Sequence, residues 1–221
     1  MTDPHAQGNA LAVLGLLAHT ELASFSRLAA DAVAAPALDQ RLELSRMAAM
    51  AMGRLELVDS RVTDLGSGLQ AAMGPFAGAL VDLDARTAPS TWTERLLNAY
   101  VGYGVVDDFC RVVAGPLDPT TRDLVDEVLA DDGHAGLVVE TLAGAGTRDG
   151  TLASRLALWG RRLVGESLGA VQRLLADHPA LRDLLVQAQG SGGVPGDAQQ
   201  RLFSTLTAEH SRRMERLGLT P

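Results

Sequence analysis

Apolar residues recur at intervals of three and four along most of the chain, which is the spacing that places them on one face of an α-helix. Glycines, prolines and capping residues divide this pattern into separate helices. No run of residues with the alternation of a β-strand has a convincing length, so the chain is predicted to be all-α. The helices are expected at 9–35, 38–65, 91–115, 118–144, 151–176, 178–190 and 197–217.

The connection between the second and third predicted helices is much longer than the other connections. It covers residues 67–89 and carries only a short apolar piece at 80–83. Two helix hairpins joined by one long crossover form the ferritin-like type of four-helix bundle. We therefore expect a single ferritin-like domain over residues 1–221, with a core bundle at 9–145, additional helices at 151–217 and a flexible linker at 190–196.

Ionisable residues interrupt the apolar stripes of three of the first four helices. Glu21 lies in the middle of the stripe of the first helix. Asp108 and Asp131 lie in the middle of the stripes of the third and fourth helices. A buried carboxylate is costly unless it is paired, protonated or bound to a metal. Each of these residues could instead lie at the edge of its stripe and reach solvent, and Asp107 competes with Asp108 for the inward position.

The fourth helix adds a histidine to this pattern. His134 lies three residues after Asp131, so both side chains share one helix face and can hold one ion. In the second helix, the comparable stripe position is Ala51, with Arg54 one turn further on. The arginines around His210 in the last helix are expected to form a solvated face.

Four segments together resemble the actinobacterial ferritin-like family related to tRNA-(2-methylthio-N6-isopentenyl-adenosine) hydroxylase. The similarity covers about residues 10–175, and its order and spacing make it fairly specific. It implies a ferritin-like bundle and, in intact members, a non-haem di-iron site that activates O₂ to hydroxylate a prenyl group on a modified tRNA base. The segments are LLAHTELASFSRLAADA (16–32), RMAAMAMGRLELV (46–58), TWTERLLNAYVGYGVVDDF (91–109) and EVLADDGHAGLVVE (127–140).

The resemblance carries over to only part of the ligand set. The metal ligands that it implies here are Glu21, Asp108, Asp131 and His134. Members often carry Asp where this chain has Tyr103, which leaves the choice of Asp108 open. The Glu-x-x-His of the second helix falls on Ala51 and Arg54, so both ligands are missing there.

The charges of these residues decide how much metal the site could hold. Three carboxylates and the Arg54 guanidinium leave a charge that one divalent ion, such as iron, would balance and that two irons would exceed. Without any ion, Arg54 can pair with one or two of the carboxylates, because its planar fork suits them and it stays protonated. A remaining carboxylate should then hold a proton. The site is therefore interpreted as eroded, with one divalent metal or none.

Composition and charge limit the partners and the chemistry. The 221 residues carry a net charge of −8, no lysine and one cysteine, which excludes a P-loop or Schiff-base lysine, an intrachain disulfide and a cysteine-cluster zinc site. The acidic balance disfavours tRNA binding, which needs clustered basic residues. No membrane span or export signal is evident, so we expect a cytoplasmic protein with no membrane partner, and we expect a homodimer.

Two functions of different classes fit this pattern. The first is a non-catalytic helical scaffold or binding protein of the hydroxylase-like family. The alternative is a working non-haem iron oxygenase with a reduced ligand set, acting on a prenylated tRNA base or another small substrate. Metal content and O₂ reactivity distinguish the two.

Overall fold

The computed structural model describes residues 4–130, 133–190 and 195–221, and every regular element within these ranges is a helix. The all-α prediction is confirmed. The helices are α1 (Pro4–Ala34), α2 (Leu38–Asp64), α3 (Leu69–Met73), α4 (Val81–Arg86), α5 (Trp92–Leu97), α6 (Tyr103–Ala114), α7 (Pro119–Val128), α8 (His134–Arg148), α9 (Gly150–Asp177), α10 (Pro179–Ala188) and α11 (Pro195–Arg216), with short 3-10 and π segments at Gly74–Phe76 and Asn98–Gly102.

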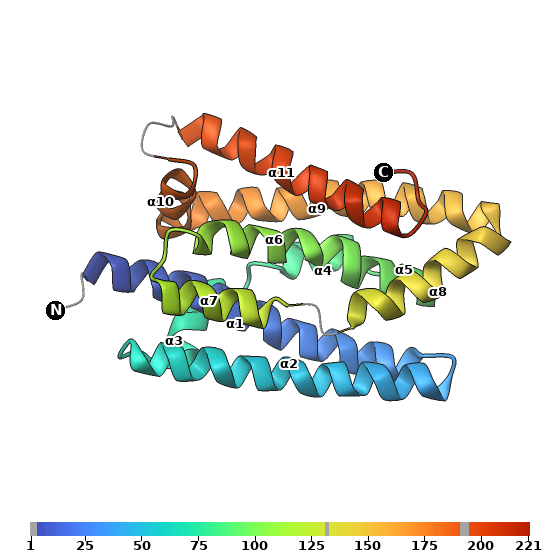
Figure 1. Cartoon of the computed structure of the whole chain (residues 1–221), viewed down its shortest axis with the longest axis horizontal. Coiled ribbons are helices and arrows are strands. Elements are labelled where there is room, and N and C mark those ends of the chain that lie inside the picture. The colour runs from blue at the N-terminus through green and yellow to red at the C-terminus, as the bar shows by residue number, and fades with distance from the viewer. Residues whose placement is uncertain (1–3, 131–132, 191–194) are drawn as a thin grey trace.

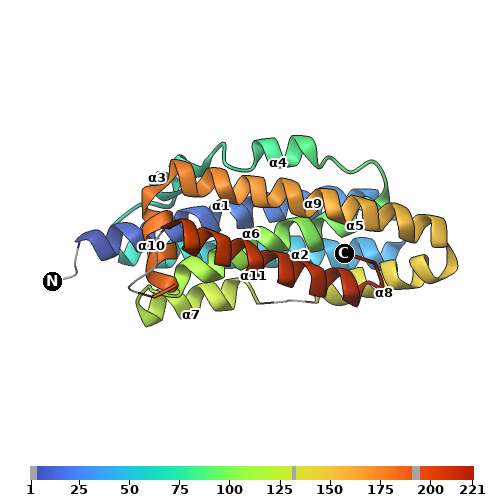
Figure 2. The same cartoon turned by 90° about the horizontal axis from the view of Figure 1, so that it is seen from above.

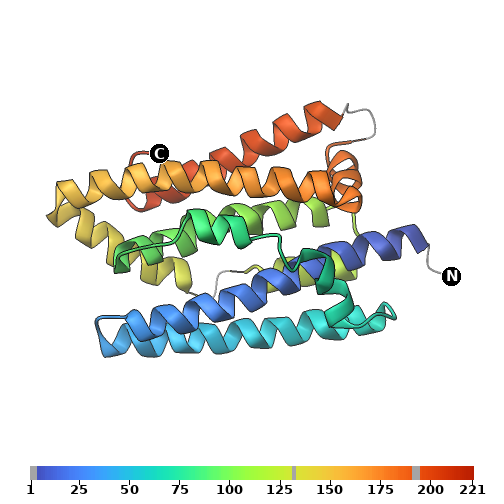
Figure 3. The ribbon, with the colours of Figure 1, turned by 180° about the vertical axis from the view of Figure 1, so that it is seen from behind.

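The long helices run side by side along the long axis of the molecule. Figure 1 shows α2 along one edge, α11 along the opposite edge and α6 between them. The α1–α2 hairpin packs along its whole length, and α6 contacts α1, α7, α9, α10 and α11. Seen from above, α4 and α7 lie on opposite sides of the bundle (Figure 2). The long crossover at 65–91 passes over one face of the bundle, as Figure 3 shows from behind.

The centre of the molecule is α6, whose apolar residues cover more than half of its circumference and whose charged residues, Asp107, Asp108 and Arg111, share the remaining side. An apolar surface this broad is stable only when several neighbouring helices cover it. Here α1 and α7 cover one side and α9 to α11 cover the other. The additional C-terminal helices therefore complete the core around α6. The side chains of α6 that are 0% exposed are Val105, Val106, Phe109, Cys110 and Val113.

The helix predicted at 91–115 is continuous but contains one wide turn. It begins with the expected capping box, in which the Thr91 hydroxyl accepts from the Glu94 amide and the Glu94 carboxylate accepts from the Thr91 amide. A π-helical segment follows at Asn98–Gly102. The Asn98 side-chain amide donates to the Thr87 carbonyl at 3.0 Å, which fastens the crossover to this turn. Turns of this kind occur frequently at functional sites.

The prediction of a single helix at 118–144 is wrong, because the structure has two helices there, α7 and α8. The Asp118 N-cap is present, since its side chain accepts from the Thr121 amide. The first helix nevertheless ends at Val128, and the next begins at His134. Gly133 has a φ of 99°, which is a left-handed conformation that glycine adopts without steric cost and that a right-handed helix cannot contain.

Helix length and apolar character also bear on membrane association. None of the helices within the described ranges combines the length and the apolar composition that crossing a bilayer requires.

Candidate functional site

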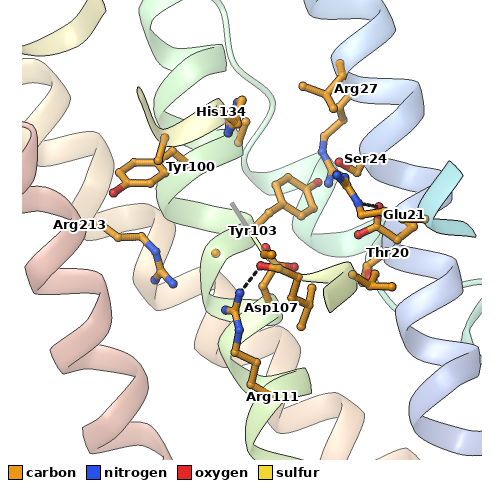
Figure 4. A pocket seen from close by; sticks show the side chains of 18 of the residues that line it. Thr20, Glu21, Ser24, Arg27, Tyr100, Tyr103, Asp107, Arg111, His134 and Arg213 are labelled. Carbon is orange, nitrogen blue, oxygen red and sulfur yellow. Dashed lines mark hydrogen bonds and ion pairs between the residues drawn. The ribbon is translucent and has the colours of Figure 1, made fainter. Parts of the chain in front are cut away.

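A cavity of about 290 Å³ lies in the middle of the bundle, between α1, α6, α8 and α11. Figure 4 shows its side chains converging from these helices. Most of its wall is polar, which is unusual for the interior of a helical bundle. The ionisable side chains on the wall are Glu21, Arg27, Arg54, Tyr100, Tyr103, Asp107, Arg111, His134, Arg213 and Arg216.

Glu21 and Arg54 form an ion pair at one side of this cavity. The Nε of Arg54 lies 2.9 Å from Oε2 of Glu21. The two side chains are 18% and 7% exposed, so the pair is largely shielded from water. Glu21 is thus in the bundle interior, as its stripe position predicted. Its carboxylate has a guanidinium beside it, at the place where the family resemblance expects ligands from the second helix.

The two adjacent aspartates of α6 point in different directions. Asp107 lies on the cavity wall, whereas Asp108 contacts Arg213 of α11. The Asp108 carboxylate accepts from Arg111 Nη1 at 3.2 Å and from Arg213 Nη2 at 2.6 Å. The structure therefore places Asp107, not the expected Asp108, at the cavity, and two arginines already hold Asp108.

Burial raises the pKa of Asp107 above its ordinary value. The nearby guanidinium groups of Arg111, Arg213 and Arg27 oppose this shift, and the Asp108 carboxylate reinforces it. Desolvation is the larger effect, because it penalises the ionised carboxylate wherever water is excluded. Asp107 is thus a carboxyl group that holds its proton to a higher pH than usual.

The remaining sequence-predicted residues are divided between the cavity and other locations. His134, at the first position of α8, lines the cavity together with Glu21. Ala51 is fully buried in α2 but is not part of the wall. Asp131 lies outside the described residues. Two of the four predicted ligands, Glu21 and His134, are therefore brought to one cavity, and Asp108 is not.

Arg27 is a central cavity residue that the sequence pattern did not reveal. Its guanidinium carbon lies 3.2 Å from the centre of the Tyr103 ring, which is a cation–π contact. Burial lowers the pKa of Arg27 to about 10, and nearby carboxylates led by Asp84 partly oppose this shift. A signal was available, because Ser24 and Arg27 continue the helix face of Glu21 at three-residue intervals.

The solvated face that the sequence predicted for the last helix is present only in part, because Arg212 is 64% exposed whereas Arg213 turns toward the interior. Arg213 is 15% exposed and lies flat against α6 at Gly104, where a Cβ atom would be 2.8 Å from the guanidinium carbon. Arg216 donates to the Tyr100 hydroxyl at 3.3 Å. His210, in the same helix, is buried, and burial lowers its pKa to about 4. Helix α11 therefore contributes one wall of the cavity.

The described donor set does not fit a di-iron centre. Glu21 is ion-paired with Arg54, and Ala51 has no ligating atom. Within the parts of the chain that the structure describes, no three His, Cys, Asp or Glu side chains gather in a way that could hold a metal ion. The chemistry that this wall offers is hydrogen-bond donation from guanidinium and hydroxyl groups.

Comparison with known proteins identifies one family. The model of a ferritin-like domain of actinomycetes matches residues 6–188. No curated protein matches the sequence. The matched range includes α1 to α10 and ends before α11, so Arg213 and Arg216 follow the region that the family model describes.

Proposed function

The chain belongs to the ferritin-like domain family of actinomycetes, and we propose that it is a non-catalytic binding protein derived from a tRNA-hydroxylase-like ancestor. In this proposal, arginine side chains have replaced the metal centre. The observation that supports it best is the ion pair between Arg54 and Glu21 at 2.9 Å. This pair joins the residue that stands in place of a lost ligand to the carboxylate that would have bound the metal.

Electrostatics explains why such a pair disfavours iron. Two unit charges 4 Å apart interact by about 4 kcal/mol at an effective dielectric constant of 20, so a divalent ion at that distance from Arg54 would be repelled by about 8 kcal/mol. Arginine cannot relieve this repulsion, because it does not deprotonate in proteins. Burial raises the pKa of Asp107, and the same desolvation disfavours the ionised carboxylate that a metal would need.

The proposal is tested by the metal content of the purified protein after anaerobic loading with Fe(II), followed by measurement of O₂ consumption. We expect less than one iron per chain and no O₂ consumption above that of the buffer. Two irons per chain would refute the proposal. One iron per chain with O₂ consumption would instead support the oxygenase with a reduced ligand set, for which the shared location of Glu21 and His134 is the supporting observation.

A pair of substitutions sharpens this test. The double variant Ala51→Glu, Arg54→His returns the ligand pair of intact family members to α2, and we expect it to bind more iron than the parent protein. The matched control is Leu42→Glu, Ser45→His, which places the same two residue types at the same spacing on the exposed face of α2. Equal iron binding by the two variants would contradict the assignment of Ala51 and Arg54 to a former metal site.

A further inference from the structure

Arg27 carries a buried positive charge on the cavity wall and lacks a hydrogen-bond acceptor. Its Nη1 atom is buried and has no hydrogen-bond partner within the described ranges. The side chain is charged at neutral pH, because burial lowers its pKa only to about 10. A buried charged donor without a partner is costly, and native proteins rarely contain one. The surroundings of Arg27 are therefore incomplete without a further group that accepts hydrogen bonds.

The acidic side chains near Arg27 do not supply that group. Glu21 is paired with Arg54 at 2.9 Å, and Asp31 is paired with Arg95 at 3.1 Å. None of the acidic residues that affect the pKa of Arg27 forms an ion pair with it in the parts of the chain that the structure describes. These residues are Asp84, Asp107, Asp31 and Glu21. An anion from outside the chain can take the vacant position as counterion.

The hydroxyl of Tyr103 is a second buried donor at the same place. It also has no hydrogen-bond partner within the described ranges. The guanidinium carbon of Arg27 lies 3.2 Å from the centre of the Tyr103 ring, and Figure 4 shows the hydroxyl beside the guanidinium. Arg213 lies on the opposite side of the cavity, where Asp108 holds it at 2.6 Å. The free donors that lie together are thus those of Arg27 and Tyr103.

Two neighbouring donors and one positive charge match a carboxylate. A carboxylate has two oxygen atoms in one plane, and it accepts charge-assisted hydrogen bonds from guanidinium and hydroxyl groups. Its single negative charge balances that of Arg27. A phosphate group has more oxygen atoms than these two donors can satisfy and carries a larger negative charge. The acidic side chains around Arg27 would repel that larger charge more strongly.

The size of the cavity and the rest of its wall indicate what the carboxylate is attached to. A volume of about 290 Å³ is close to the lower end of the range for small-molecule sites. Apolar side chains complete the wall, among them Leu28, Val128 and Leu129. These surfaces can cover a compact apolar group and exclude water from the charged end of the ligand.

We propose that the central cavity binds a small organic carboxylate, whose oxygen atoms accept hydrogen bonds from Nη1 of Arg27 and the hydroxyl of Tyr103. This inference rests on the proposed function, since it assigns a ligand class to the cavity of a non-catalytic binding protein. The ion pair of Glu21 and Arg54 stays intact when the ligand binds.

The test is isothermal titration of EDTA-treated protein with benzoate, benzamide and phenyl phosphate. We expect one benzoate per chain. Benzamide has nearly the same shape without the charge, so it should bind at least about tenfold more weakly. Phenyl phosphate should also bind more weakly than benzoate.

Two substitutions assign the carboxylate to its donors. Arg27→Gln and Tyr103→Phe should each weaken benzoate binding about tenfold or more, because each removes a charge-assisted hydrogen bond. Tyr103→Phe retains the ring beneath the guanidinium and removes one oxygen atom, so it tests the proposal even if Arg27→Gln does not fold. The control Arg46→Gln, at an exposed position of α2, should leave the affinity unchanged. Circular dichroism establishes that each variant is folded.

Several outcomes would overturn the proposal. These are no binding of benzoate at millimolar concentration, benzamide or phenyl phosphate binding as tightly as benzoate, and unchanged benzoate affinity in Tyr103→Phe. Iron content after Fe(II) loading is measured on separate samples of the same preparations. Less than one iron per chain without benzoate binding would refute only this inference, whereas two irons per chain would refute the proposed function.

Discussion

The pair of Glu21 and Arg54 yields a quantitative prediction about stability. Arg54→Met removes the guanidinium and leaves the Glu21 carboxylate, which is 7% exposed, without this partner. Breaking a fully buried ion pair in this way costs about 3–5 kcal/mol, while an exposed pair contributes about 0–1 kcal/mol. Because Arg54 is 18% exposed, we expect an intermediate loss of about 2–3 kcal/mol in the free energy of unfolding.

A double-mutant cycle isolates the contribution of the pair itself. The variants are Arg54→Met, Glu21→Gln and their combination, and the assay is urea unfolding followed by circular dichroism at pH 7 in the presence of EDTA. The double variant should be less destabilised than Arg54→Met alone, because it leaves no buried charge uncompensated. The expected coupling energy is about 1.5–2.5 kcal/mol.

A surface pair of the same chain provides the matched comparison. Arg212 and Glu209 form an ion pair on α11, with side chains 64% and 37% exposed. The cycle for this pair should give about 0.5 kcal/mol or less. A coupling below about 0.5 kcal/mol for Glu21 and Arg54 as well would refute the view that Arg54 electrostatically replaces a metal ligand.

Three further predictions concern packing and titration. Gly15→Ala should destabilise the protein by about 3 kcal/mol in urea unfolding, since the new Cβ would lie 2.1 Å from the Ala72 carbonyl oxygen; Gly8→Ala, in the same helix with nothing within 4 Å, should stabilise it by up to about 1 kcal/mol. Burial lowers the pKa of His210 to about 4, so stability should fall as pH drops from about 6.5 to about 4, by at most ~1.4 kcal/mol per pH unit, and His210→Gln should abolish this dependence. The raised pKa of Asp107 gives the opposite dependence of stability on pH, because the native state holds this proton more tightly than the unfolded chain does. Stability should therefore decline as pH rises above about 4, and Asp107→Asn should remove this decline and increase stability at pH 7.

Capping signals, which depend on a few neighbouring residues, predicted the starts of helices correctly. The capping box at Thr91 and Glu94 and the N-cap at Asp118 mark helix starts in the structure as they do in the sequence. The break between α7 and α8 was missed, because apolar residues recur at helical spacing on both sides of it, at Leu124 and Val128 and again at Ala135 and Val138. Periodicity does not record the backbone conformation of a single residue, and the left-handed Gly133 lies within this stretch.

The candidate site was predictable only from residues that look out of place in their own helix. Glu21 was found because a carboxylate in an apolar stripe is an anomaly. Arg213 gave no such signal, because an arginine near a helix end is normally solvated. Its burial depends on α6, which approaches α11 closely at Gly104, and on Gly160 of α9, where a Cβ would lie 2.4 Å from Met214. These are tertiary contacts between segments far apart in sequence.

The arrangement of charges at the cavity bears on which ions it can bind. Glu21 is paired with Arg54, and Asp108 is paired with Arg111 and Arg213. Each of these carboxylates is paired with a guanidinium that is fixed in charge and that also borders the cavity. A divalent cation would have to displace these guanidinium groups before either carboxylate could bind it. In the proposed function, the ion pairs therefore account for a low affinity for metal without any change in the bundle that surrounds the cavity.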